Sequence, residues 1–315
     1  MEEHLAARSA CVIFDVSHMS KLRVRGNGAQ KWLEKVLSRK VGECADGCSA
    51  HMLLLDDAGH IIDRLVMLRE SAGNFLLLGH AGVAPQVKER LSALRQHAAI
   101  EVPDETDSWC AVVLMGPQSE QVISRVLRGV ELPPPEHFLR FTYQHQSLII
   151  SRSGLQQETE TERAYEFFCP AVSGISWFES FMGAGAQPGG IATRESLRLE
   201  RGCAAVGSEI TRRSTPESVK LSHLCGAEKT NADKSAPPHD SIARLRCDAA
   251  PAAPPTPGSA VRDTAGNTVG YITSAAFSPD VGEVLAMALL HTSLVQPGIH
   301  LVIMVQGHAI PATVL

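Results

Sequence analysis

The sequence contains no apolar run near the roughly 20 residues that a membrane-spanning helix needs. It also lacks a surplus of basic charge, because 29 Lys and Arg residues are outnumbered by 34 Asp and Glu residues, for a net charge of −5. No basic cluster forms the kind of stripe that follows a phosphate backbone. We therefore expect neither a membrane nor a nucleic acid as a partner of this protein.

Two common catalytic motifs are missing as well. A glycine-rich phosphate loop is not present, since Gly183-x-Gly185 lacks a preceding strand and Pro188 stands where a third glycine would be needed. The Gly-x-Ser-x-Gly motif of a strained nucleophilic serine is also absent. These absences argue against a dinucleotide-binding enzyme and against a serine hydrolase.

Eight cysteines are spread along the chain. Several lie within apolar runs, such as Cys11 and Cys169, which is typical of buried, reduced thiols in a cytoplasmic protein. Cys44-x-x-x-Cys48 could supply half of a metal site, but no second Cys/His pair stands at a zinc-like spacing, so we expect no metal. The acidic segment Met1–His4 is typical of neither a signal peptide nor a transit sequence, and we expect a cytoplasmic location.

The 315 residues are enough for two or three compact units, each with its own core. The first part of the chain alternates short apolar strands with amphipathic helices, and Asp56–Gly59 predicts a tight hairpin turn. A stretch rich in proline and alanine, Asn231–Gly258, precedes short strands with almost no helical pattern. We predict a mixed α+β domain at residues 1–235 and a small all-β domain at residues 236–315.

Three polar groups could carry chemistry. His18 follows a predicted strand and could be a general base or a ligand, although a structural histidine bonded to backbone is the commoner case. In the predicted helix Arg194–Arg201, Arg194 and Arg198 share one face. They could form a salt-bridged surface, or one guanidinium could hold a carboxylate. Glu158 lies in a polar segment, which is either a solvated loop or a carboxylate at the mouth of a pocket.

Six groups of residues change this reading when they are taken together. They are Phe14–Met19, Asp56–Leu65, Met115–Gln118, Ser151–Gly154, Arg194–Gly202, and Gly270–Ser274 with Phe277–Pro279. Their order and spacing resemble the T-protein of the glycine cleavage system, the family of tetrahydrofolate-dependent aminomethyltransferases. The resemblance extends from about residue 5 to residue 315.

This resemblance implies an α+β fold of the folate-binding aminomethyltransferase type. Such a fold has interwoven α+β units, one of them ferredoxin-like, and a small C-terminal β-barrel. It also implies a reaction in which the one-carbon unit of an aminomethyl-lipoyl H-protein passes to tetrahydrofolate and ammonia is released. The expected partners are therefore tetrahydrofolate and the lipoylated H-protein.

The resemblance also suggests site residues, and here the chain departs from the family. The family has two aspartates where this chain has Asp63 and Arg64, and an arginine can only donate hydrogen bonds. Neighbouring strand residues point to opposite faces, so Asp63 takes over the catalytic position only if the register shifts. The residues expected to contact folate are Met19, His51, Arg64, His80, Glu158 and Arg194.

Three functions remain open at this point. The first is a divergent aminomethyltransferase that still binds folate. The second is a non-catalytic folate-binding relative of the iron–sulfur maintenance type, although Lys220–Glu228 matches the motif of those proteins poorly. The third is another folate-dependent demethylation, with His51, Arg64 and His80 reshaping the pocket.

Overall fold

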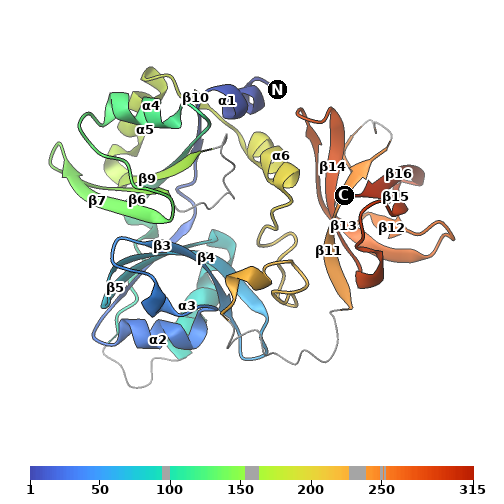
Figure 1. The fold of residues 1–315 in the computed structure, drawn as a ribbon, viewed down its shortest axis with the longest axis horizontal. Coiled ribbons are helices and arrows are strands. Elements are labelled where there is room, and N and C mark those ends of the chain that lie inside the picture. Colours follow the sequence, from blue (N-terminus) through green and yellow to red (C-terminus); the bar gives the residue numbers. More distant parts are fainter. Residues whose placement is uncertain (94–99, 153–162, 227–238, 249–250, 252) are drawn as a thin grey trace. The chain divides into compact units, whose positions relative to one another are not determined.

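The computed structural model describes residues 1–93, 100–152, 163–226, 239–248, 251 and 253–315, which fall into two compact units. The first unit comprises residues 1–57 and 62–190, and the second comprises residues 58–61 and 191–315. Figure 1 shows two sheets with their helices in the first unit, and a helix and a barrel in the second. None of the described helices is both long and apolar enough to cross a membrane.

The larger sheet of the first unit has the strand order β10-β1-β6-β9-β8-β7, in which only the β1·β10 pair is parallel. Helices α4 and α5 pack on it, and Trp177 and Phe181 of α5 lie against Phe167 of β9, with ring centroids 5.2 and 5.0 Å away. The elements are α1 (Glu2–Ser9), β1 (Val12–Asp15), β6 (Trp109–Met115), α4 (Ser119–Val126), β7 (His137–Tyr143), β8 (Gln146–Arg152), β9 (Ala164–Pro170), α5 (Gly174–Gly183) and β10 (Gln187–Pro188).

The smaller sheet of the first unit has the order β2-β5-β4-β3. In Figure 1 helices α2 and α3 lie on the same side of this sheet. Trp32 and Leu33 of α2 share a core with Leu91 of α3 and Met67 of β4, as the apolar stripe of an amphipathic helix requires. The elements are β2 (Ser20–Arg25), α2 (Ala29–Val36), β3 (Ser49–Leu55), β4 (Ile61–Ser71), β5 (Asn74–Gly79) and α3 (Ala84–Ala93).

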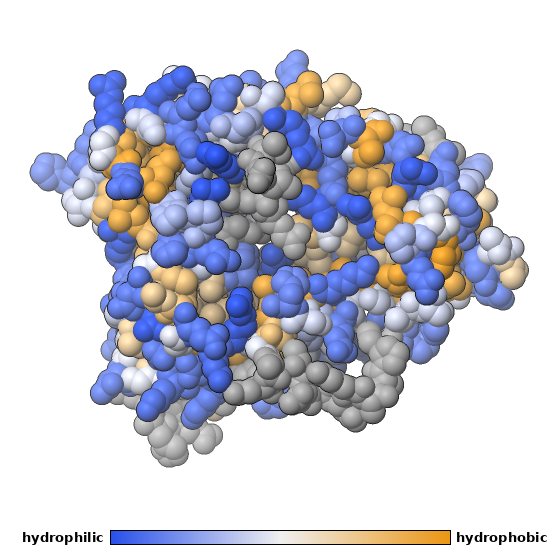
Figure 2. Space-filling view, viewed as in Figure 1, coloured by the Kyte–Doolittle hydropathy of each residue, from blue (hydrophilic) through white to orange (hydrophobic). Residues whose placement is uncertain are grey.

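The second unit contains α6 and a closed barrel with the order β11-β14-β13-β12-β15-β16. Inward-facing side chains such as Val261, Ile272, Ala288 and Ile303 fill the barrel. The elements are α6 (Ile191–Arg201), β11 (Asp240–Cys247), β12 (Ala260–Arg262), β13 (Thr268–Ser278), β14 (Glu283–His291), β15 (His300–Val305) and β16 (His308–Val314). Because the apolar faces are buried in these cores, the surface in Figure 2 is mostly hydrophilic.

The predicted α+β architecture with a C-terminal β-barrel is confirmed. The sequence patterns did not predict the two edge strands of the larger sheet, β7 and β10. Strand β7 has many exposed positions, and β10 is only two residues long, both of them exposed. The expected boundary at residue 235 lies outside the described residues.

The expectation of reduced thiols throughout is wrong for one pair. Cys44 and Cys48 are joined in a disulfide, with their Cα atoms 5.8 Å apart. The chain between them turns back through Gly47, whose φ of +86° suits glycine. Because each sulfur is bonded to the other, this pair does not supply half of a metal site.

Candidate functional site

A buried carboxylate and a half-exposed imidazole meet at one end of the smaller sheet. The Asp63 side chain is fully buried, and its Oδ1 lies 2.9 Å from Nδ1 of His80. Its Oδ2 accepts a hydrogen bond from the backbone N–H of His80 at 3.0 Å, and Oδ1 also accepts from the N–H of Arg64 at 2.8 Å. Since a carboxylate only accepts, Nδ1 of His80 carries a proton, and in the neutral form of the ring Nε2 is the acceptor.

Strand pairing explains how residues 17 positions apart come together. Strands β4 and β5 are antiparallel neighbours, with Val66 opposite Leu78, so the start of β4 lies beside the end of β5. Gly79 is the last residue of β5, and a Cβ atom there would lie 2.4 Å from Oδ2 of Asp63 and 2.6 Å from Cδ2 of Leu65. The carboxylate therefore fits only because residue 79 has no side chain.

We expect Gly79→Ala to destabilise the first unit by about 1–3 kcal/mol, as overpacking of a filled interior usually does. The added methyl group must displace the Asp63 carboxylate or the Leu65 side chain, both of which are buried. Urea-induced unfolding followed by circular dichroism measures the change. Gly82→Ala is the matched control, because a Cβ at Gly82 meets nothing within 4 Å. Equal stability of the two variants would contradict this account.

The other predicted site residues of the first unit are dispersed. Met19 is buried just before β2, and because Ser20 pairs with Gly79, Met19 and His80 lie at the same end of the sheet. His51 is half-buried on β3, and Arg64 on β4 is 9% exposed. The structure therefore brings together Asp63 and His80 by direct hydrogen bonds, with Arg64 joined through its backbone N–H. Glu158 lies outside the described residues.

Arg194 belongs to the second unit, where α6 carries it. Burial lowers the pKa of its guanidinium, and the neighbouring Glu195 carboxylate offsets this only in part. Both carboxylate oxygens of Glu195 are bonded to Arg198 instead, Oε2 at 2.9 Å from Nε. Among the described residues, no hydrogen bond or ion pair is formed by the Arg194 side chain.

Arg198, by contrast, is part of a closed network. Its guanidinium donates to Oε2 of the fully buried Glu209 side chain at 2.8 Å. Glu209 Oε1 also accepts from the hydroxyls of Thr273 and Ser274 on β13, at 2.7 and 2.6 Å. The predicted salt-bridged helix is confirmed for Arg198, which holds α6 to its own unit. The ligand-holding role predicted for Arg194 stays a prediction.

Sequence patterns missed a polar cluster around the Phe14–Met19 segment. The Lys21 side chain is fully buried, and its Nζ donates to the carbonyl oxygens of Ser17 and Met19, each at 2.9 Å. Burial lowers the pKa of Lys21 to about 8. Ser17 Oγ accepts from the N–H of Ala111 at 3.0 Å and lies 3.3 Å from Sγ of Cys110. His18, which precedes Met19, is exposed.

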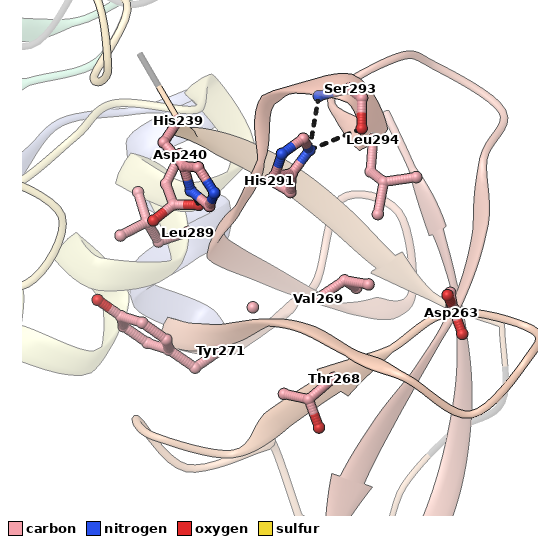
Figure 3. Close-up of a pocket in the computed structure, with 11 residues that line it drawn as sticks. His239, Asp240, Asp263, Thr268, Val269, Tyr271, Leu289, His291, Ser293 and Leu294 are labelled. Atoms are coloured by element: carbon pink, nitrogen blue, oxygen red, sulfur yellow. Dashed lines mark hydrogen bonds and ion pairs between the residues drawn. The ribbon is translucent and has the colours of Figure 1, made fainter.

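The barrel contains a separate cavity of about 520 Å³ (Figure 3). The rings of His239 and His291 meet there edge to face, with centroids 4.7 Å apart. His239 Nδ1 lies 2.8 Å from Asp240 Oδ1, and His291 Nδ1 lies 2.7 Å from Ser293 Oγ. No predicted site residue that the structure describes lines this cavity. Across the described part of the chain, no three His, Cys, Asp or Glu side chains are grouped to hold a metal ion.

A protein of known structure has the same architecture. The fold is that of a glycine cleavage system aminomethyltransferase, as a solved structure shows. The glycine cleavage system aminomethyltransferase T from Bartonella henselae superimposes with a TM-score of 0.89 at 24% identity, over 99% of this chain and 87% of that one. At this identity the likeness concerns the fold alone.

Family models and curated relatives identify the family. The GCVT N-terminal domain matches residues 1–229, and the glycine cleavage T-protein C-terminal barrel domain matches residues 241–315. An aminomethyltransferase from Prosthecochloris aestuarii is 28% identical over 73% of this chain and 64% of its own length. Another, from Chlorobaculum tepidum, is 27% identical over 99% of this chain and 88% of its own length. The chain belongs to the glycine cleavage T-protein family, a family of aminomethyltransferases.

Proposed function

We propose that this protein is a tetrahydrofolate-dependent aminomethyltransferase of the glycine cleavage system. It takes the aminomethyl group from the lipoyl arm of the H-protein, passes the methylene carbon to tetrahydrofolate and releases ammonia. The observation that carries the proposal is the Asp63–His80 pair, which gives this family member a fixed hydrogen-bond acceptor next to Arg64.

The Asp63–His80 pair would compensate for the replacement of the family's second aspartate by Arg64. Arg64 stands where the resemblance expects a second aspartate, and it offers only donors. Asp63 is fully buried and works through His80, whose side chain is 36% exposed. Asp63 fixes the orientation of the ring and the position of its proton. His80 can then accept a hydrogen bond or a proton from the amino-bearing reactants.

Arg194 would hold the acidic end of the ligand. Folates carry carboxylates, and a guanidinium binds a carboxylate through two parallel hydrogen bonds. Arg194 is half-buried, and an arginine charge that is partly removed from water without a partner favours an anionic occupant. Burial lowers the pKa of Arg194, and a bound carboxylate would offset this effect by stabilising the charged guanidinium.

Two measurements on the intact protein test the proposal. Calorimetric titration with tetrahydrofolate should give micromolar affinity, and mixing with aminomethylated H-protein should produce methylene-tetrahydrofolate and ammonia. Folate binding without turnover would favour the non-catalytic relative, and no binding of any reduced folate would sink the proposal.

Arg194→Gln should weaken tetrahydrofolate binding by roughly 10–100-fold, because a hydrogen-bonded charge pair contributes about 1.5–3 kcal/mol. Calorimetry measures the affinity directly. Arg213→Gln is the control, since Arg213 is exposed in the same unit. A second titration with a pterin that lacks the glutamate tail should give the same affinity for the Arg194 variant and the unaltered protein. A loss with both ligands would place Arg194 elsewhere than at the tail.

A further inference from the structure

We propose that Cys110 and Cys169 form a peroxide-sensitive thiol pair, in which Cys110 reacts first and Cys169 converts the product into a disulfide. This is a modification site of the first unit, separate from the disulfide between Cys44 and Cys48. It does not depend on the protein's ability to bind folate.

The first argument is strand register. Cys110 on β6 and Cys169 on β9 are directly opposite each other in an antiparallel pair. Opposite residues in such pairs have Cα atoms about 4.5 or 5.5 Å apart, depending on the kind of pair. Disulfides need about 4.4–6.8 Å, so both kinds fall within range. A bond between the two sulfurs therefore requires no large movement of the backbone.

The second argument is the surroundings of Cys110. Cys169 donates a hydrogen bond to its sulfur, Ser17 Oγ lies 3.3 Å from Sγ, and the Lys21 ammonium is nearby. Helix α5 begins against it, because a Cβ on Gly174 would lie 2.7 Å from Sγ of Cys110. Helix N-termini and cations favour a thiolate. The hydrogen bonds and Lys21 together lower the pKa of Cys110 to about 6, against burial and Asp15.

The third argument is that the two thiols divide their tasks. Cys110 is partly exposed and can be reached by a small oxidant, whereas Cys169 is buried. The hydrogen bond to Cys110 and burial both raise the pKa of Cys169, so Cys169 keeps its proton while Cys110 is ionised. One thiolate beside one protonated thiol is the arrangement that an attacking and a resolving cysteine need.

The chemistry balances with hydrogen peroxide as the oxidant. The Cys110 thiolate attacks one peroxide oxygen, the O–O bond breaks, and hydroxide leaves and becomes water by taking up a proton. The Cys169 sulfur then attacks the sulfenic sulfur, the S–S bond forms, and the S–O oxygen leaves as water with the proton of Cys169. Two thiols lose two electrons, and one peroxide is reduced to two waters.

The test exposes the intact protein to hydrogen peroxide at pH 7 and follows each cysteine by mass spectrometry of peptides under non-reducing conditions. We expect a Cys110–Cys169 link that a thiol reductant reverses. Cys110 should react roughly tenfold faster than the partly exposed Cys203, because the hydrogen bonds from Cys169 and Ser17 and the charge of Lys21 favour its thiolate. Cys169→Ser should stop at a sulfenic acid that dimedone traps, and Cys247→Ser, the control, should still form the link.

Two outcomes would overturn the proposal. One is oxidation of Cys110 at the same rate as Cys203. The other is oxidation of Cys110 to a sulfinic acid in the unaltered protein with no link to Cys169. Circular dichroism of the Cys169→Ser protein shows whether the variant is folded, and the unaltered protein alone decides the result if it is not.

One consequence rests on the proposed function. Ser17 bonds both to Cys110 and to the backbone of Ala111, and Lys21 holds the carbonyls on either side of His18. Oxidation removes the thiolate from this cluster, beside Met19. If the protein binds tetrahydrofolate, the oxidised form should bind it about three- to tenfold more weakly, the loss of one hydrogen bond. An unchanged affinity would count against this consequence but not against the disulfide, which is measured separately.

Discussion

Asp63→Asn is expected to lower kcat for aminomethyl transfer about 100-fold, the lower range of general acid–base contributions. The asparagine amide replaces one of two accepting oxygens by a donor, while three donors from His80 and Arg64 face this side chain. If the amide nitrogen takes the place of Oδ1, the His80 ring must move its proton to Nε2 and the exposed acceptor is lost; if it takes the place of Oδ2, it faces the backbone N–H of His80, another donor. Initial rates of methylene-tetrahydrofolate formation with saturating H-protein measure the change.

A double variant separates positioning from simple structural support. If Asp63 acts through His80, Asp63→Asn combined with His80→Gln should be no slower than His80→Gln alone. KM for tetrahydrofolate should change less than kcat. Asp57→Asn is the matched control, because the Asp57 side chain is 89% exposed and its ion pair with Arg90 is worth little. An unchanged kcat in folded Asp63→Asn protein would remove the pair from the mechanism.

Glu209→Ala should destabilise the second unit by about 3–5 kcal/mol, the usual cost of breaking a buried ion pair. The change removes the acceptor for Arg198 and for the hydroxyls of Thr273 and Ser274, and also for the N–H of Ala205 at 2.9 Å. Burial opposes the charge of Arg198, and only the carboxylates of Glu195 and Glu209 raise its pKa. Without Glu209, part of that stabilisation is lost.

Urea unfolding monitored by circular dichroism measures this loss, and the transition of the second unit should move while that of the first stays. Glu209→Gln should cost less, because the amide keeps one acceptor and the shape. Glu217→Ala is the control, since Glu217 is exposed in the same unit. If Glu209→Ala lowered the free energy of unfolding by less than about 1 kcal/mol, the hydrogen-bond network of Glu209 would contribute no more than an exposed ion pair does.

Local patterns in the sequence were sufficient for most elements and for the family. The Asp57-Ala58-Gly59 turn is present between β3 and β4, and Gly59 has the positive φ of +86° that its residue type suits. The helix at Arg194 and the strands of the barrel also follow from periodicity. Turns and amphipathic stripes depend on residues that are close together in the chain, so a short stretch of sequence is enough to predict them.

The same patterns could not identify the partners within the site. His80 is recognisable as a polar residue after a strand, but its bond to Asp63 depends on β4 and β5 being neighbours and on Gly79 leaving room. The alternation of strand residues predicts that the side chains of Asp63 and Arg64 point to opposite faces of β4. It does not indicate that the Asp63 side chain is fully buried, or that it is bonded to the half-exposed ring of His80.

The sequence by itself determined most of the elements, the family and the short list of charged residues that could form the site. Only the tertiary structure decided which of them meet. It set Cys110 opposite Cys169, tied Glu209 to Thr273 and Ser274, and joined Asp63 to His80. The physical reason is that strand register and helix packing are fixed by burial over the whole unit, and a shift of one residue would send every one of these side chains to another neighbour.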